Sequence, residues 1–147
     1  MKRKLKYLKT VNRRPTDNQL TELWKEACHL RDGGVCRYTK EILHVSLSRN
    51  EAVLQIHHVM KKASSRLKWD LDNGIVLTKG VHFSIAHSNS PTQENQFRQW
   101  ALGRLPTKNR ADLEFLERQK KTGGVDKFAL KLYLEKKIEK FKEDIQD

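Results

Sequence analysis

Residues 53–59, VLQIHHV, carry the clearest strand signal in the chain and contain two adjacent histidines. Neighbouring residues on a strand point to opposite faces of the sheet, so one imidazole is expected on each side. A second short apolar run, residues 75–77 (IVL), lies between Gly74 and Gly80. The two runs are separated by residues 60–73, a polar loop that is long for a hairpin, and such loops commonly carry functional residues.

The rest of the chain has mostly helical periodicity. Thr16 or Asp17 can cap a first helix, and Gly33-Gly34 can end it. Residues 42–47 alternate in hydrophobicity and are expected to form a further strand. Additional helices are predicted to start within residues 81–87 and to cover residues 91–105, 108–119 and 125–143. The predicted fold class is therefore α+β, with a small sheet among helices.

The charge is strongly positive and unevenly distributed. The chain of 147 residues has a formal net charge of +12, and residues 1–14 contain seven lysines or arginines and no acidic residue. An arm of this kind favours phosphate groups, so DNA is the expected partner. No apolar run approaches the ~20 residues of a membrane span. The N-terminus also lacks the apolar segment of a secretory signal, so we expect a cytoplasmic protein of a bacterial or phage-infected cell, without membrane contact.

Three histidines and one asparagine form a spaced set: His57-His58 on the first strand, Asn73 before the second strand, and His82 at a helix start. If the strands pair and the helix packs across them, these side chains converge. Phosphodiester hydrolysis needs a base for water and a cation for the phosphate charge. Two neighbouring imidazoles on opposite faces can divide these tasks, because a neutral imidazole acts either as base or as metal ligand.

The order and spacing of these segments resemble those of the HNH nucleases, whose core is a ββα-metal fold. The matching stretches are LQIHHV, DLDNGIVL and TKGVH, within a similarity that covers roughly residues 20–100. LRDGGVC and NSPTQENQF are similar to the sequences that precede and follow the core in many members. The resemblance implies that His58 is the general base and that His57 and His82 bind a metal ion. It further implies that Asn73 either reaches the metal or braces the loop that aims His58, and that the products carry 5′-phosphate and 3′-hydroxyl ends.

The chain departs from the family pattern at two places. Many members have another histidine four residues after the last motif histidine, whereas here His87 follows His82 by five. On a regular α-helix five residues turn about 500°, which is about 140° off the starting face. His87 is expected as a third metal ligand if this helix is irregular. Relatives with a structural zinc carry cysteine pairs, but Thr39 stands three residues after Cys36, so no structural zinc is expected.

The ligand set leaves the identity of the metal open. Two or three imidazoles suit Zn²⁺, Mn²⁺ or Ni²⁺, while such nucleases commonly turn over with Mg²⁺. We expect one divalent ion, Mg²⁺ or Mn²⁺, with Zn²⁺ or Ni²⁺ as alternatives.

The predicted function is a DNA endonuclease that uses one divalent cation and a histidine base to produce nicks or double-strand breaks. Basic residues beside the catalytic loop and in the arm are expected to hold DNA phosphates: Lys61, Lys62, Arg66, Lys68, Arg13 and Arg14. The alternatives are a non-catalytic DNA-binding protein with a similar fold and a basic protein-interaction adaptor. A pure binder has no need of the set His58, Asn73 and His82, which favours the nuclease.

The expected organisation has three parts. These are a basic N-terminal arm (residues 1–15), an HNH nuclease domain (16–105) with a small ββα-metal core and an N-terminal helix, and a C-terminal helical extension (106–147). The apolar faces of the extension could cover the core, form a homodimer or dock a partner.

Overall fold

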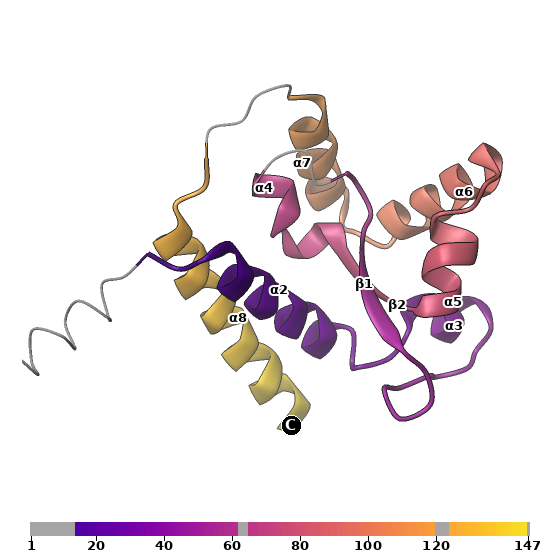
Figure 1. The fold of residues 1–147 in the computed structure, drawn as a ribbon, viewed down its shortest axis with the longest axis horizontal. Helices are drawn as coiled ribbons and strands as arrows, with labels where there is room; N and C mark the ends of the chain where they lie inside the picture. The colour runs from indigo at the N-terminus through magenta and orange to yellow at the C-terminus, as the bar shows by residue number, and fades with distance from the viewer. Residues whose placement is uncertain (1–13, 62–64, 120–123, 147) are drawn as a thin grey trace, which may run out of the picture.

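The computed structural model describes residues 14–61, 65–119 and 124–146 and contains helices around a two-stranded antiparallel sheet (Figure 1). This confirms a mixed α and β fold that is mostly helical. The α-helices are α2 (Asp17–Arg31), α3 (Arg37–Ile42), α4 (Ser65–Lys68), α5 (Lys79–Val81), α6 (Pro91–Gly103), α7 (Thr107–Arg118) and α8 (Lys127–Gln146). The strands are β1 (Leu54–His58) and β2 (Gly74–Thr78), with a 3₁₀ turn η1 (Leu71–Asn73) and a π-helical turn η2 (His82–Ala86).

Local signals define both ends of α2. Thr16 is the N-cap, and its hydroxyl accepts a hydrogen bond from the Gln19 amide at 3.2 Å, while Gln19 Oε1 accepts from the Thr16 amide at 2.9 Å. This reciprocal pair is a capping box. After the helix, Gly33 and Gly34 have φ values of +72° and +69°, a region that glycine enters without steric cost.

The two strands pair over their full length, from Leu54 opposite Thr78 to His58 opposite Gly74. Their alternation sends residues to two different hydrophobic clusters. Val76 packs with Trp24 on the side of α2 and α8, whereas Ile75 and Leu77 pack on the side of α3, η2 and α6. The small sheet therefore lies between two layers of helices.

The first cluster joins distant parts of the chain. Leu20 and Trp24 of α2 pack against Leu134 and Ile138 of α8, and all four are buried. In Figure 1, α8 runs alongside α2 on the side away from α6. Gly74 lies close against α2, because a Cβ there would be 2.6 Å from the Trp24 ring and 2.7 Å from the Cys28 sulfur. The C-terminal residues thus share a core with α2.

The described parts of the loop between the strands pack against α6 and α7. Met60 and Leu67 form a third buried cluster with Leu102 and Leu113. The loop also contains the short helix α4 and the turn η1, where the sequence predicted irregular structure. Burial of Met60 and Leu67 holds the loop beside β1.

The predicted strand at residues 42–47 is wrong. The chain forms α3 up to Ile42 and then runs without regular structure, with His44 at a φ of +56°. A strand needs a partner, and this segment has no ladder among the described residues: the Cys36 amide donates to Leu47 O at 3.1 Å, and a single bridge joins Val35 to Ser48.

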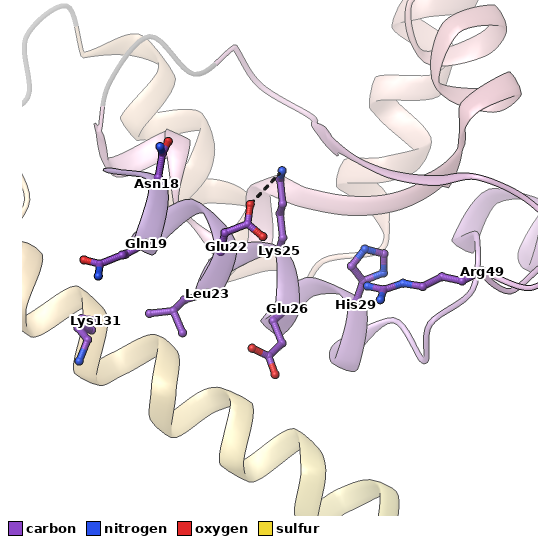
Figure 2. Close-up of a pocket in the computed structure, with 9 residues that line it drawn as sticks. All are labelled: Asn18, Gln19, Glu22, Leu23, Lys25, Glu26, His29, Arg49 and Lys131. Carbon is purple, nitrogen blue, oxygen red and sulfur yellow. Dashed lines mark ion pairs between the residues drawn. The ribbon is translucent and has the colours of Figure 1, made fainter. Parts of the chain in front are cut away.

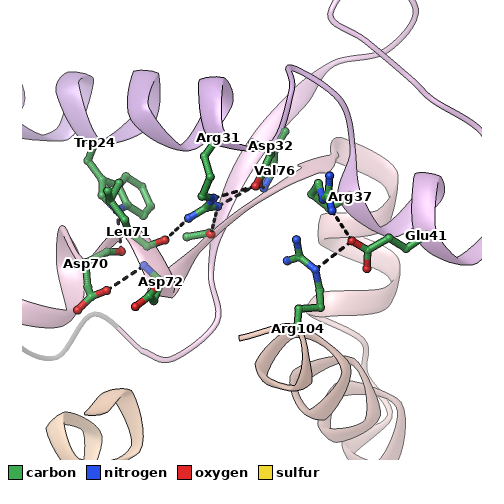
Figure 3. Close-up of polar contacts among 11 residues, drawn as sticks. Trp24, Arg31, Asp32, Arg37, Glu41, Asp70, Leu71, Asp72, Val76 and Arg104 are labelled. Carbon is green, nitrogen blue, oxygen red and sulfur yellow. Dashed lines mark hydrogen bonds and ion pairs between the residues drawn. The ribbon is translucent and has the colours of Figure 1, made fainter. Parts of the chain in front are cut away.

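A polar network ties the C-terminal end of α2 to the hairpin (Figure 3). Arg31 donates to the Asp32 carboxylate and to the backbone carbonyls of Leu71 and Gly74, the latter at 2.6 Å. Asp32 in turn accepts from the Val76 amide at 3.0 Å. These contacts fix the position of α2 relative to β2, and residues of α2 line one side of the site described below.

The helices in the described part of the chain are all too short or too polar to cross a bilayer.

Candidate metal centre and adjoining histidine

Three histidines converge beside the sheet. His57 lies on β1, His82 is the first residue of η2, and His87 directly follows the last residue of η2. One ring nitrogen from each comes within 4.8 Å of the others, and the Nε2 atoms of His82 and His87 are 3.1 Å apart. These three imidazoles are placed to hold a metal ion.

The π-helical turn explains how two histidines five residues apart share one face. The His87 amide donates to His82 O at 3.0 Å, an i→i+5 hydrogen bond that takes one more residue into the turn than an α-helix does. The 140° offset expected on a regular α-helix is thereby reduced. This irregularity brings His87 into the cluster. An irregular helix is the condition under which the sequence predicts His87 as a third ligand.

Burial keeps the central ligand neutral. The pKa of His57 is lowered to about 3, first by burial and then by the neighbouring imidazoles of His82 and His87. The pKa of His82 is also lowered, by burial and by His87. A metal ion binds the neutral imidazole, so these environments fit a ligand set at neutral pH.

Gln55 orients His82 and was not anticipated from the sequence. Gln55 lies two residues before His57, on the same face of β1, and its Oε1 is 2.7 Å from His82 Nδ1. An amide oxygen can only accept, so Nδ1 carries the proton and Nε2 keeps its lone pair. Such a contact fixes the tautomer of a ligating histidine. The alternation of strand residues was the signal that could have identified Gln55.

His58 lies on the opposite face of β1, against α2. Its ring stacks on the indole of Trp24, with centroids 4.5 Å apart and an interplanar angle of 15°. Its Nε2 is 2.9 Å from the backbone carbonyl of Lys68. A carbonyl accepts only, so Nε2 carries the proton, and in the neutral ring the lone pair is on Nδ1. Trp24 is itself anchored through a hydrogen bond from Nε1 to Asp70 O at 2.9 Å.

Asn73 braces the loop. Its fully buried side chain accepts from the Met60 amide at 2.7 Å and donates to the carbonyls of Met60 and Leu67 at 3.1 and 2.9 Å. The amide nitrogen of Asn73 thus donates twice to the loop backbone. One of its acceptors, the carbonyl of Leu67, is one residue before the Lys68 carbonyl that orients His58. Of the two roles left open by the sequence, the geometry favours bracing.

One pocket joins the two faces. It encloses about 500 Å³ and is lined by all four of these histidines together with residues of α2, β1 and the loop: Thr21, Trp24, Lys25, Ile56 and Lys61. Residues from opposite faces of β1 can share a pocket because β2 covers one edge of the strand and leaves the other open. Thr21 and Lys25 were not predicted, since nothing in the local sequence of α2 distinguishes them from other surface positions.

The predicted DNA-binding residues are distributed unevenly. Lys61 is exposed and lines the histidine pocket, whereas exposed Arg66 lines a different pocket beside Asp70. Lys68 lies over the Trp69 ring at 4.8 Å. Arg14 is exposed at the start of the described chain. Arg13 and Lys62 lie outside the described residues.

A larger pocket of about 800 Å³ lies on the outer side of α2 (Figure 2). Figure 2 shows Glu22 paired with Lys25, and His29 beside Arg49. Lys25 lines both pockets. The larger pocket mixes carboxylates and cations and is open to solvent, so the histidine pocket, although smaller, is the better candidate for chemistry.

No protein-family model, curated protein or solved structure matches this chain.

Proposed function

We propose that this protein is a metal-dependent DNA endonuclease of the HNH type. The observation that carries the proposal is the shared pocket, in which three imidazoles able to hold one ion lie beside a fourth, His58, that belongs to the other face of the strand. A ligand set alone would suit a structural metal. A separate imidazole beside it suits hydrolysis, which requires a base next to the cation.

The finer fold assignment, a ββα-metal core, is part of the same proposal. β1, β2 and the helical segment α5–η2 occur in this order in the chain, with α4 and η1 in the loop between the strands. The candidate ligands are His57 on the first strand, and His82 and His87 at the start and directly after the end of η2. The order His58, Asn73, His82 in the sequence supports this assignment, and so does the buried position of Asn73 within the loop.

The roles of the residues follow from their contacts. His57, His82 and His87 would hold one divalent ion, and such an ion would supply positive charge to offset that of the phosphate in the transition state. His58 would take a proton from water, and the contact of its Nε2 with the Lys68 carbonyl at 2.9 Å orients the ring. Lys25 and Lys61 line the same pocket and attract flanking phosphates. One such site in each chain cuts one strand, so a monomer nicks DNA and a dimer can break both strands.

The test is cleavage of supercoiled plasmid by the full chain with Mg²⁺, Mn²⁺, Zn²⁺ or Ni²⁺, and with EDTA. Wild type is expected to nick the plasmid with at least one of these ions and not with EDTA. His58→Ala should lower the rate by about 10²- to 10⁴-fold, the usual contribution of a general base. Its metal binding, measured as a thermal shift, and its DNA binding should remain.

His29→Ala is the matched control, because His29 lies on α2 outside the cluster and outside the histidine pocket. It should cleave like wild type. If His58→Ala also cleaved like wild type, the proposed mechanism would be wrong. Salt-sensitive DNA binding with no cleavage under any of the four ions would instead favour the alternative that the charge of +12 supports, a non-catalytic DNA-binding protein.

A further inference from the structure

Phe83 is an exposed aromatic residue inside the metal-binding turn. It directly follows the ligand His82 and is 56% exposed. A single exposed apolar ring is ordinary on a protein surface, so what distinguishes Phe83 is its position beside the three histidines. The neighbouring ligand His87 is exposed as well, so the outer side of the turn is open to a large molecule.

The ring of Phe83 contacts the histidine cluster. It stacks on the His82 ring with centroids 5.2 Å apart and an interplanar angle of 30°. His82 is held in turn by Gln55 at 2.7 Å. Phe83 thus stacks directly on a candidate metal ligand that Gln55 orients.

A nucleic acid that places a phosphate at the three histidines must pass close to this ring. Successive nucleotides of a B-form strand rise by about 3.4 Å, so the nucleotides that flank the scissile phosphate lie within reach of Phe83. A phenyl ring offers no hydrogen bond or positive charge to a phosphate. Its favourable partners are the face of a base or the sugar.

We propose that Phe83 inserts against a base beside the scissile phosphate and thereby selects DNA that unstacks readily at the cut. This inference rests on the proposed function and names its substrate class. Inserting an apolar wedge into a duplex unstacks a base step. The cost is lowest at pyrimidine–purine steps, at mismatches and at branch points, where stacking is already weak. Such DNA should be cleaved faster than a perfectly paired duplex.

The experiment compares Phe83→Ala with Phe115→Ala, a matched control on α7 whose ring is also 56% exposed but belongs to no contact with the cluster among the described residues. Each full-length variant is given a perfect duplex and the same duplex with a central mismatch, under the ion that supports cleavage by wild type. Phe83→Ala should lose about 5- to 100-fold in kcat/KM on the mismatched duplex, the range of one base–aromatic contact. Phe115→Ala should match wild type, and Phe83→Trp should restore most of the rate.

A second readout does not depend on cleavage. Binding of wild type and of Phe83→Ala to a duplex carrying 2-aminopurine, a base analogue that fluoresces more when unstacked, is measured in EDTA and with the metal ion. Wild type should raise the fluorescence at one position, and Phe83→Ala should not. Thermal shifts with the metal ion alone should be equal for the two proteins.

The outcomes separate this inference from the proposed function. If Phe83→Ala cleaved both duplexes like wild type, or lost no more than Phe115→Ala, the inference would be wrong and the nuclease assignment would stand. If Phe83→Ala lost metal binding in proportion to its rate, Phe83 would support His82 and would not contact DNA. If wild type did not cleave but still unstacked the probe through Phe83, the nuclease assignment would fail and the DNA contact would stand.

Discussion

Replacing Asn73 by alanine should destabilise the fold more than the same replacement at any other asparagine or glutamine near the site. The side chain is fully buried and makes three hydrogen bonds to the loop backbone, one with the Met60 amide and two with the carbonyls of Met60 and Leu67. Alanine leaves the buried Met60 N–H without its acceptor, which costs about 1–3 kcal/mol. The two lost carbonyl bonds add about 0.5–1.5 kcal/mol each. The expected loss in the free energy of unfolding is about 4 kcal/mol, a large share of the total for a domain.

Urea unfolding followed by far-UV circular dichroism measures this loss, with EDTA present so that metal binding does not contribute. Asn109→Ala is the control, because Asn109 makes one side-chain bond, to Asp72 at 3.0 Å, in a half-buried position. It should lose about 1 kcal/mol or less. Asn73→Asp separates packing from hydrogen bonding. It keeps the shape but turns an oxygen toward two carbonyls, so it should also be strongly destabilised. A loss for Asn73→Ala no larger than that of Asn109→Ala would refute the bracing role.

Two further predictions concern the metal ligands and pH. Gln55→Leu removes the acceptor of His82 Nδ1 and should weaken metal binding by about 10- to 100-fold, measured by calorimetry, with little change in DNA binding; unchanged metal affinity would contradict this role. Burial raises the pKa of Asp70 to about 6, against about 3.9 in an unfolded chain, so its protonated form favours the folded state. The stability it contributes is complete below pH of about 4 and is lost as the pH rises through 6. Asp70→Asn keeps an acceptor for the Asp72 amide. It should be more stable than wild type at pH 8, by at most about 3 kcal/mol, as measured by urea unfolding. Equal urea midpoints for the two proteins at pH 8 would contradict this prediction.

Much of the local structure follows from short stretches of sequence. Thr16 and Gln19 are three residues apart, so they can form the capping box of α2 whatever the rest of the chain does. The alternation of a strand likewise sends His57 and His58 to opposite faces. The strand predicted at residues 42–47 failed because strand formation depends on a partner, which a local pattern does not specify.

The sequence by itself determined the types and the order of the candidate site residues, together with the excess of positive charge. Tertiary structure alone decided that η2 is π-helical and brings His87 to His82, that a carbonyl ten residues away sets the tautomer of His58, and that Lys25 of α2 lines the pocket. The physical reason is the distance along the chain between the interacting residues. Caps and strand alternation depend on residues a few positions apart. The convergence of four imidazoles depends on packing between segments far apart in the chain, and on the buried contacts of Asn73 and Trp24 that hold those segments in place.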